Sequence, residues 1–141
     1  MRGEGRGGVR SPVFLINSRC NDWTASVAAC AAAVATLEIY ENEKLFDRAA
    51  EMSVYFLESV FSLQNLGVVT DVRGYGMLAG FDIAPEGAPG RRGNLLQKRL
   101  FDAGLHIKTT GDAGLLAPAF IVEKDQIDEM VEILKQELIR L

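Results

Sequence analysis

Few residues of this 141-residue sequence stand in a pattern typical of a catalytic or metal-binding site. His106 is the only histidine, so no second imidazole is present for a metal site or for paired acid–base catalysis. Cys20 and Cys30 lack the spacing of a metal-binding motif, and we expect two thiols rather than a disulfide. Asp112 follows Gly111, an order typical of a turn rather than of a catalytic acid. These residues predict neither a metal centre nor a catalytic pair.

A glycine-rich segment, Gly74-Tyr-Gly76 with Gly80 shortly after it, superficially resembles a nucleotide-binding loop. It has no Gly-Lys-Ser/Thr motif and no helix is predicted directly after it, so we interpret it as a turn between two strands. Arg73, beside Gly74, is able to bind an anion. We interpret Arg73 as a charged residue at a strand end that faces solvent.

Two helices are predicted in the first half of the chain. Alanine content favours a helix over residues 25–40. A second helix is predicted after an N-cap at Asn42, with apolar residues at three- and four-residue spacing along one buried face. These residues are Leu45, Ala49, Met52, Phe56, Val60 and Leu63.

The second half predicts four strands and two helices. In order, they are strands at 68–72 and 77–83, a helix around 95–100, strands at 105–107 and 115–118, and a helix at 125–139. The first two strands form an antiparallel hairpin, and Pro118 favours an edge position for the last strand. Asp125 or Glu123 caps the last helix. The pattern predicts an α+β fold, with helices packed on one face of an antiparallel sheet.

Composition excludes several classes of protein. Apolar residues make up 48% of the chain and charged residues 24%, which is typical of a globular domain and not of disorder or a fibre. The longest apolar run, residues 27–35, is far shorter than the ~20 residues that span a bilayer. The net charge is −4, and the basic residues of the glycine-rich arm 1–21 are few. We expect a cytoplasmic protein that binds neither nucleic acid nor membrane.

Five segments carry a resemblance to a known family. They are the alanine-rich run 28–40, the break at 42–46, the Val-Arg-Gly-Tyr-Gly hairpin within 71–82, the segment 104–112 and the lead 117–123 into the last helix. In this order they resemble the C-terminal small domain of the class III, pyridoxal-phosphate-dependent aminotransferases, of fold type I. Within the family, the β-alanine (ω-amino acid):pyruvate branch is the most similar. The resemblance covers residues 22–141, and residues 1–21 are expected to be an unrelated flexible arm.

The resemblance implies a cofactor that this chain does not hold. In the family, the lysine that forms the Schiff base with pyridoxal phosphate lies upstream of the alanine-rich helix, in a large domain outside these 141 residues. Lys108 has no nearby acid for the pyridinium nitrogen. The remaining lysines, expected at exposed helix positions or caps, are Lys44, Lys98, Lys124 and Lys135. We expect no catalytic residue, no cofactor-binding residue and no activity of the chain alone.

Two positions of this sequence match functional positions of the family. Asp22 stands where the family has a threonine that contacts the cofactor phosphate, and a carboxylate there repels the phosphate. Lys108 stands where the family has an arginine that binds the substrate carboxylate. Lysine keeps the positive charge but not the two-pronged geometry. Lys108 is therefore the candidate for carboxylate binding, and Asp22 predicts a lost phosphate contact.

The resemblance leaves three present-day roles open. The chain is the C-terminal domain of a β-alanine:pyruvate-type aminotransferase, a stand-alone module that binds a small carboxylate, or a self-association module derived from that domain. We expect a homo-oligomer, with an aminotransferase large domain or a full-length homologue as the other possible partner. A truncated gene product and an excised domain are both compatible with the sequence.

Overall fold

The computed structural model describes residues 27–141, and the chain divides into two compact units, Met1–Glu43 and Lys44–Leu141. The arm 1–21, with Cys20, and Asp22 lie outside the described residues. In the first unit, the predicted helix is confirmed as α3 (Val27–Asn42). None of its residues is buried.

Helix α4 (Leu45–Phe61) opens the second unit and carries much of its core. The predicted N-cap at Asn42 is wrong, because α3 continues through Asn42 and the residue before α4 is Lys44, in a left-handed conformation with φ 50°. The predicted buried face is confirmed. Its buried members are Leu45, Ala49, Phe56 and Val60, and Leu63 follows in the 3-10 helix η1 (Ser62–Asn65). Met52, also predicted on this face, is only partly buried.

Four strands form one antiparallel sheet in the order β1-β2-β4-β3. They are β1 (Val69–Tyr75), β2 (Leu78–Ile83), β3 (Lys108–Thr110) and β4 (Ala113–Leu116). The predicted hairpin is confirmed as β1–β2. Its turn contains Gly76, whose φ of 59° favours glycine, whereas Gly74 lies within β1.

Two predictions about the later strands are wrong. The strand expected at 105–107 begins only at Lys108, because Ile107, 3% exposed, packs into the core ahead of the ladder. The segment with Pro118 was expected at an edge. Strand β4 instead lies between β2 and β3, and it ends at Leu116, so the proline disturbs no ladder hydrogen bond.

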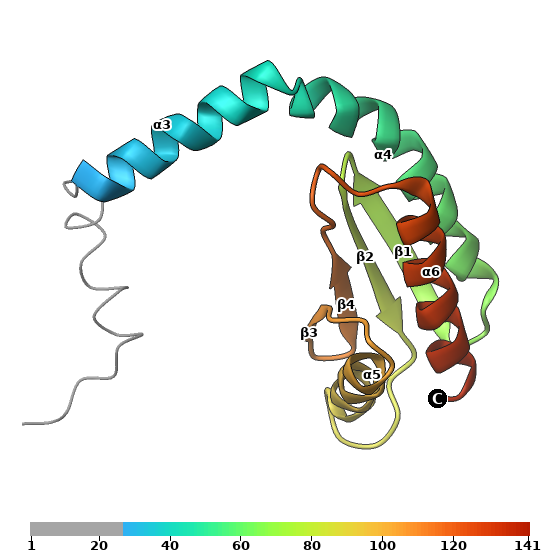
Figure 1. Ribbon diagram of the computed structural model, residues 1–141. Coiled ribbons are helices and arrows are strands. Elements are labelled where there is room, and N and C mark those ends of the chain that lie inside the picture. The colour runs from blue at the N-terminus through green and yellow to red at the C-terminus, as the bar shows by residue number, and fades with distance from the viewer. Residues whose placement is uncertain (1–26) are drawn as a thin grey trace, which may run out of the picture. The chain divides into compact units, whose positions relative to one another are not determined.

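Helices α4, α5 (Arg91–Asp102) and α6 (Lys124–Ile139) pack with the sheet around one hydrophobic core (Figure 1). Phe81 of β2 faces these helices and is fully buried, while Leu78 points the other way and is 49% exposed. This alternation shows that the sheet has one covered face and one open face. The predicted α+β class, with helices on one face, is confirmed.

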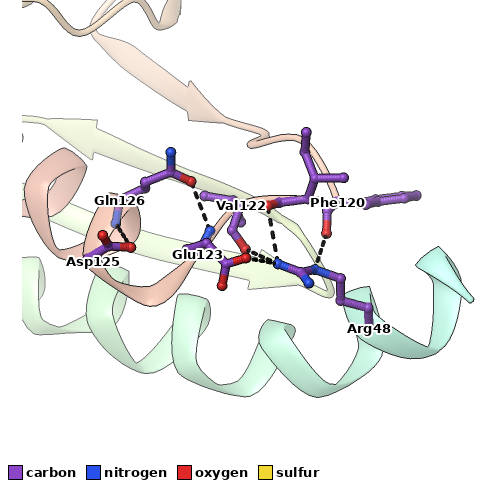
Figure 2. Close-up of polar contacts among 7 residues, drawn as sticks. Arg48, Phe120, Val122, Glu123, Asp125 and Gln126 are labelled. Carbon is purple, nitrogen blue, oxygen red and sulfur yellow. Dashed lines mark hydrogen bonds and ion pairs between the residues drawn. The ribbon is translucent and has the colours of Figure 1, made fainter. Parts of the chain in front are cut away.

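Arg48 of α4 ties the segment before α6 to the helix, as Figure 2 shows. Its Nε donates to the carbonyl oxygen of Phe120 at 3.2 Å, and its Nη2 donates to the carbonyl oxygen of Val122 at 3.3 Å and to Glu123 Oε1 at 2.6 Å. Glu123 forms a capping box with Gln126, so of the two predicted caps of α6 it is Glu123 that stands at the N-cap. The sequence pattern gave no sign of the Arg48 contacts.

Candidate functional site

The open face of the sheet forms a shallow hollow of about 450 Å³. Its lining comes from all four strands. The residues are Arg73, Gly74, Tyr75, Leu78, Ala79, Gly80, Lys108, Thr110, Ala113, Gly114 and Leu115. Both cations that the sequence offered as anion-binding candidates, Arg73 and Lys108, therefore belong to one surface.

One row of residues crosses this face from edge to edge. Arg73 pairs with Gly80, Gly80 with Leu115, and Leu115 with Lys108. Directly paired residues of antiparallel strands share a face, so the two cations stand at opposite ends of the row. The side chain of Arg73 lies over Gly80, since a Cβ built there would lie 3.9 Å from Arg73 Nε.

Two carboxylates form ion pairs with Arg73. Its Nη1 lies 2.6 Å from Asp71 Oδ2 and 2.8 Å from Asp82 Oδ2, and its Nη2 lies 3.0 Å from Asp82 Oδ1. The hydrogen bonds to Asp82, followed by that to Asp71, raise the pKa of the guanidinium, and the bond from Arg73 lowers the pKa of the Asp82 carboxyl. The group holds two negative charges and one positive charge. Arg73 is exposed, as predicted, but it lies within β1 rather than at the end of the strand, and its fork is occupied.

Lys108 has a different environment. Its side chain is exposed, and its ammonium makes no hydrogen bond or ion pair within residues 27–141. The neighbouring residues fix the strand from the covered face, because Thr109 Oγ1 donates to Gln97 Oε1 at 2.7 Å and Ile107 is buried. Lys108 is thus held toward the open face with its charge uncompensated.

Asp112 fixes the β3–β4 turn to helix α5. Its carboxylate accepts hydrogen bonds from the backbone N–H of Gly90 at 3.1 Å and of Gly93 at 2.9 Å. These N–H groups belong to the positive end of the helix, where backbone amides have no partner within the helix itself. The predicted turn position is correct, since Asp112 follows Gly111 at φ 61°. Its role as a cap for a helix about twenty residues away was not predicted, because Gly90-Arg-Arg-Gly93 carries no capping side chain of its own.

His106, the only histidine of the sequence, lies outside this hollow. His106 is exposed and separated from β3 by Ile107, and its ring meets that of Phe101 edge-on, with 6.1 Å between the ring centroids. Within the described part of the chain, no group of three or more His, Cys, Asp or Glu side chains is arranged to hold a metal ion. Among residues 27–141, no helix is long and apolar enough to cross a membrane.

Comparison with known proteins identifies relatives of this fold. The family model described as aminotransferase class-III matches residues 11–138. An omega-aminotransferase of Caulobacter vibrioides is 40% identical over 132 residues, covering 93% of this chain and 30% of that protein. An ornithine aminotransferase of Bacillus subtilis is 32% identical over 127 residues, covering 89% of this chain and 30% of that protein. The solved structure of an omega transaminase of Pseudomonas jessenii in complex with PMP gives a TM-score of 0.74 at 27% identity, covering 78% of this chain and 26% of that one.

The four-stranded sheet with three helices on one face is therefore a transaminase fold element. The chain belongs to the class III aminotransferase family. It spans about 30% of the length of the curated relatives that it matches. The family match begins at residue 11, so the expectation that the arm 1–21 is unrelated to the family is wrong for residues 11–21.

Pyridoxal phosphate, the family's cofactor, supplies an electron sink to the enzymes that bind it. A lysine that binds it needs a site that excludes water and an acid near the ring nitrogen. None of the five lysines fits. Lys98 pairs with Asp102 at 2.5 Å, Lys124 lies 4.9 Å from the centroid of the Tyr55 ring, and Lys108 stands on the open face. Lys44 and Lys135 are exposed as well.

Proposed function

We propose that this chain is the C-terminal domain of an ω-amino acid aminotransferase of the β-alanine:pyruvate type, acting in the cytoplasm. Support comes from the family membership and from the 40% identity to a protein named omega-aminotransferase. The 141 residues alone do not catalyse transamination. The observation that carries this statement is that all five lysines stand at solvent-exposed positions, none of them suited to hold the cofactor.

The contribution of this domain is substrate binding through Lys108. Its ammonium is the charge on the open face that no neighbouring side chain compensates within the described residues, and it borders a hollow large enough for a small carboxylate. A point charge binds a carboxylate with less direction than an arginine fork does. Lys108→Arg should therefore tighten the binding of pyruvate, and Lys108→Met should abolish it.

Calorimetry with pyruvate and β-alanine on the wild type and both variants tests this role. Equal binding by all three proteins would show that Lys108 is only a solvated strand residue. Binding by the wild type that the methionine variant loses would support a carboxylate site at Lys108. Complementation with the rest of an aminotransferase then separates a domain of that enzyme from the alternative role, a stand-alone carboxylate-binding module. The same hollow supports that alternative.

The catalytic part of the proposal is tested by complementation. The chain alone, with pyridoxal phosphate, should not transfer the amino group of β-alanine to pyruvate. Mixing it with the remainder of the Caulobacter omega-aminotransferase should produce activity. A borohydride-reducible adduct on a single lysine, with turnover by the chain alone, would contradict the proposal.

We also propose that the domain associates with a second copy or with an aminotransferase large domain. Large apolar side chains are exposed on the second unit, among them Phe101 at 67%, Ile121 at 62% and Phe46 at 61%. Extensive apolar patches on soluble proteins mark interaction surfaces. Sedimentation of the chain, with and without the complementing fragment, tests this, and a strict monomer in both samples would contradict it.

A further inference from the structure

The open face carries two cations, but only one of them is available to a ligand. Arg73 and Lys108 stand at the ends of one row, three strand spacings apart, which is roughly 14 Å between backbones. Both side chains are long enough to lean inward over Gly80 and Leu115. A ligand with two carboxylates would therefore find a cation at each end if both cations were unpaired.

The two aspartates prevent this. Asp82 occupies the fork of Arg73 with two hydrogen bonds, of 2.8 and 3.0 Å, and Asp71 takes a third at 2.6 Å. A two-pronged carboxylate contact is the geometry that a second ligand carboxylate would need, so Asp82 fills that position with a group of the same chemistry. The remaining charge at this end of the row is negative. It repels an anion and attracts an ammonium group.

We propose that Asp71 and Asp82 are specificity-determining residues, which restrict the open face to ligands with a single carboxylate and a neutral or cationic far end. An ω-amino acid and a monocarboxylic keto acid meet this description, and a dicarboxylic keto acid does not. In this proposal the carboxylate lies at Lys108 and the far end lies over Leu115, toward Arg73, the lining residue that both aspartates contact. This inference rests on the proposed function in one respect, namely that Lys108 binds the carboxylate.

The test is the double variant Asp71→Asn/Asp82→Asn, which keeps the shape of both side chains and releases the charge of Arg73. Binding of pyruvate and of 2-oxoglutarate is measured by calorimetry. The wild type should prefer pyruvate, and the double variant should bind 2-oxoglutarate tighter by roughly tenfold or more, the effect of one charge-assisted hydrogen bond. Adding Arg73→Met to the double variant should remove the gain.

A matched control separates this effect from the overall change in charge. Asp102→Asn/Glu132→Gln removes two exposed carboxylates that lie outside the hollow, and it should leave the preference for pyruvate unchanged. An equal gain of 2-oxoglutarate binding in this control would overturn the inference.

The outcomes also distinguish the inference from the proposed function. If the wild type binds pyruvate through Lys108 and the double variant gains nothing, the inference is overturned and the proposed function stands. If the wild type binds neither acid, the role of Lys108 in the proposed function is overturned, and the inference that rests on it is overturned as well. Absence of binding in every protein overturns both.

Discussion

The ion pair between Arg73 and Asp82 makes a prediction about pH. The pKa of the folded Asp82 carboxyl lies below its ordinary value of 3.8, because Arg73 donates two hydrogen bonds to it. The stability that this contributes is present above pH 3.8 and is lost as the pH falls through the lower folded pKa. Both side chains are partly exposed, so the effect is small.

Thermal unfolding between about pH 5 and about pH 2 should therefore show a shallower loss of stability in Arg73→Met than in the wild type. The difference between the two proteins should vanish at the acid end, where Asp82 is protonated in both. Parallel curves over the whole range would contradict the assignment.

Individual site residues were predictable from sequence to different degrees. Lys108 came from its position in a family pattern, and the exposure of Arg73 came from its place beside a turn. The partners of Arg73 were not predictable from sequence, because they depend on the register of the strands. Arg73 pairs with Gly80, and this brings Asp82, two residues further along β2, within reach. The cap that Asp112 provides was not predictable either, since Asp112 joins the β3–β4 turn to helix α5, which precedes that turn in the chain.

At the scale of elements, the contact between α5 and the β3–β4 turn leaves no room for a side chain at Gly93. A Cβ there would lie 1.9 Å from the carbonyl oxygen of Gly111. Gly93→Ala should therefore force the helix and the turn apart, at a cost of about 1–3 kcal/mol in the free energy of unfolding. Chemical denaturation measures it.

Gly67→Ala is the matched control, because a Cβ at Gly67 would meet no atom within 4 Å. It should leave the free energy of unfolding nearly unchanged. Equal stability of the two variants would show that the turn moves aside easily, and that Asp112 does not hold it firmly to α5.

The predicted elements were correct where apolar spacing was long and regular, as in α4 and α6. The short strands were less predictable. Leu105-His-Ile107 has the apolar content of a strand, but Ile107 packs into the core without joining the sheet. The ladder is formed instead by the polar residues Lys108–Thr110. Pro118 suggested an edge, although it lies beyond the end of β4.

On the scale of the whole molecule, all buried core residues among residues 27–141 belong to the second unit. The residues of this hydrophobic core run from Ala49 to Leu138, and α3 contributes none. A fragment of residues 44–141 should therefore fold cooperatively, with a Tm within a few degrees of that of the full chain. Circular dichroism melting of both proteins measures this. A fragment without a cooperative transition would contradict the division into two units.

The order of the strands also has a consequence for behaviour in concentrated solution. In the sheet of residues 44–141, β1 and β3 are outermost, so each presents backbone N–H and C=O groups on which a foreign strand can add. Strand β3 is only three residues long, but β1 has seven. Asp71 and Arg73 place opposite charges along this longer edge, and charged residues on an edge strand disfavour its pairing with a strand of another chain. We therefore expect the same ion pairs that occupy Arg73 to disfavour edge-to-edge association of this sheet.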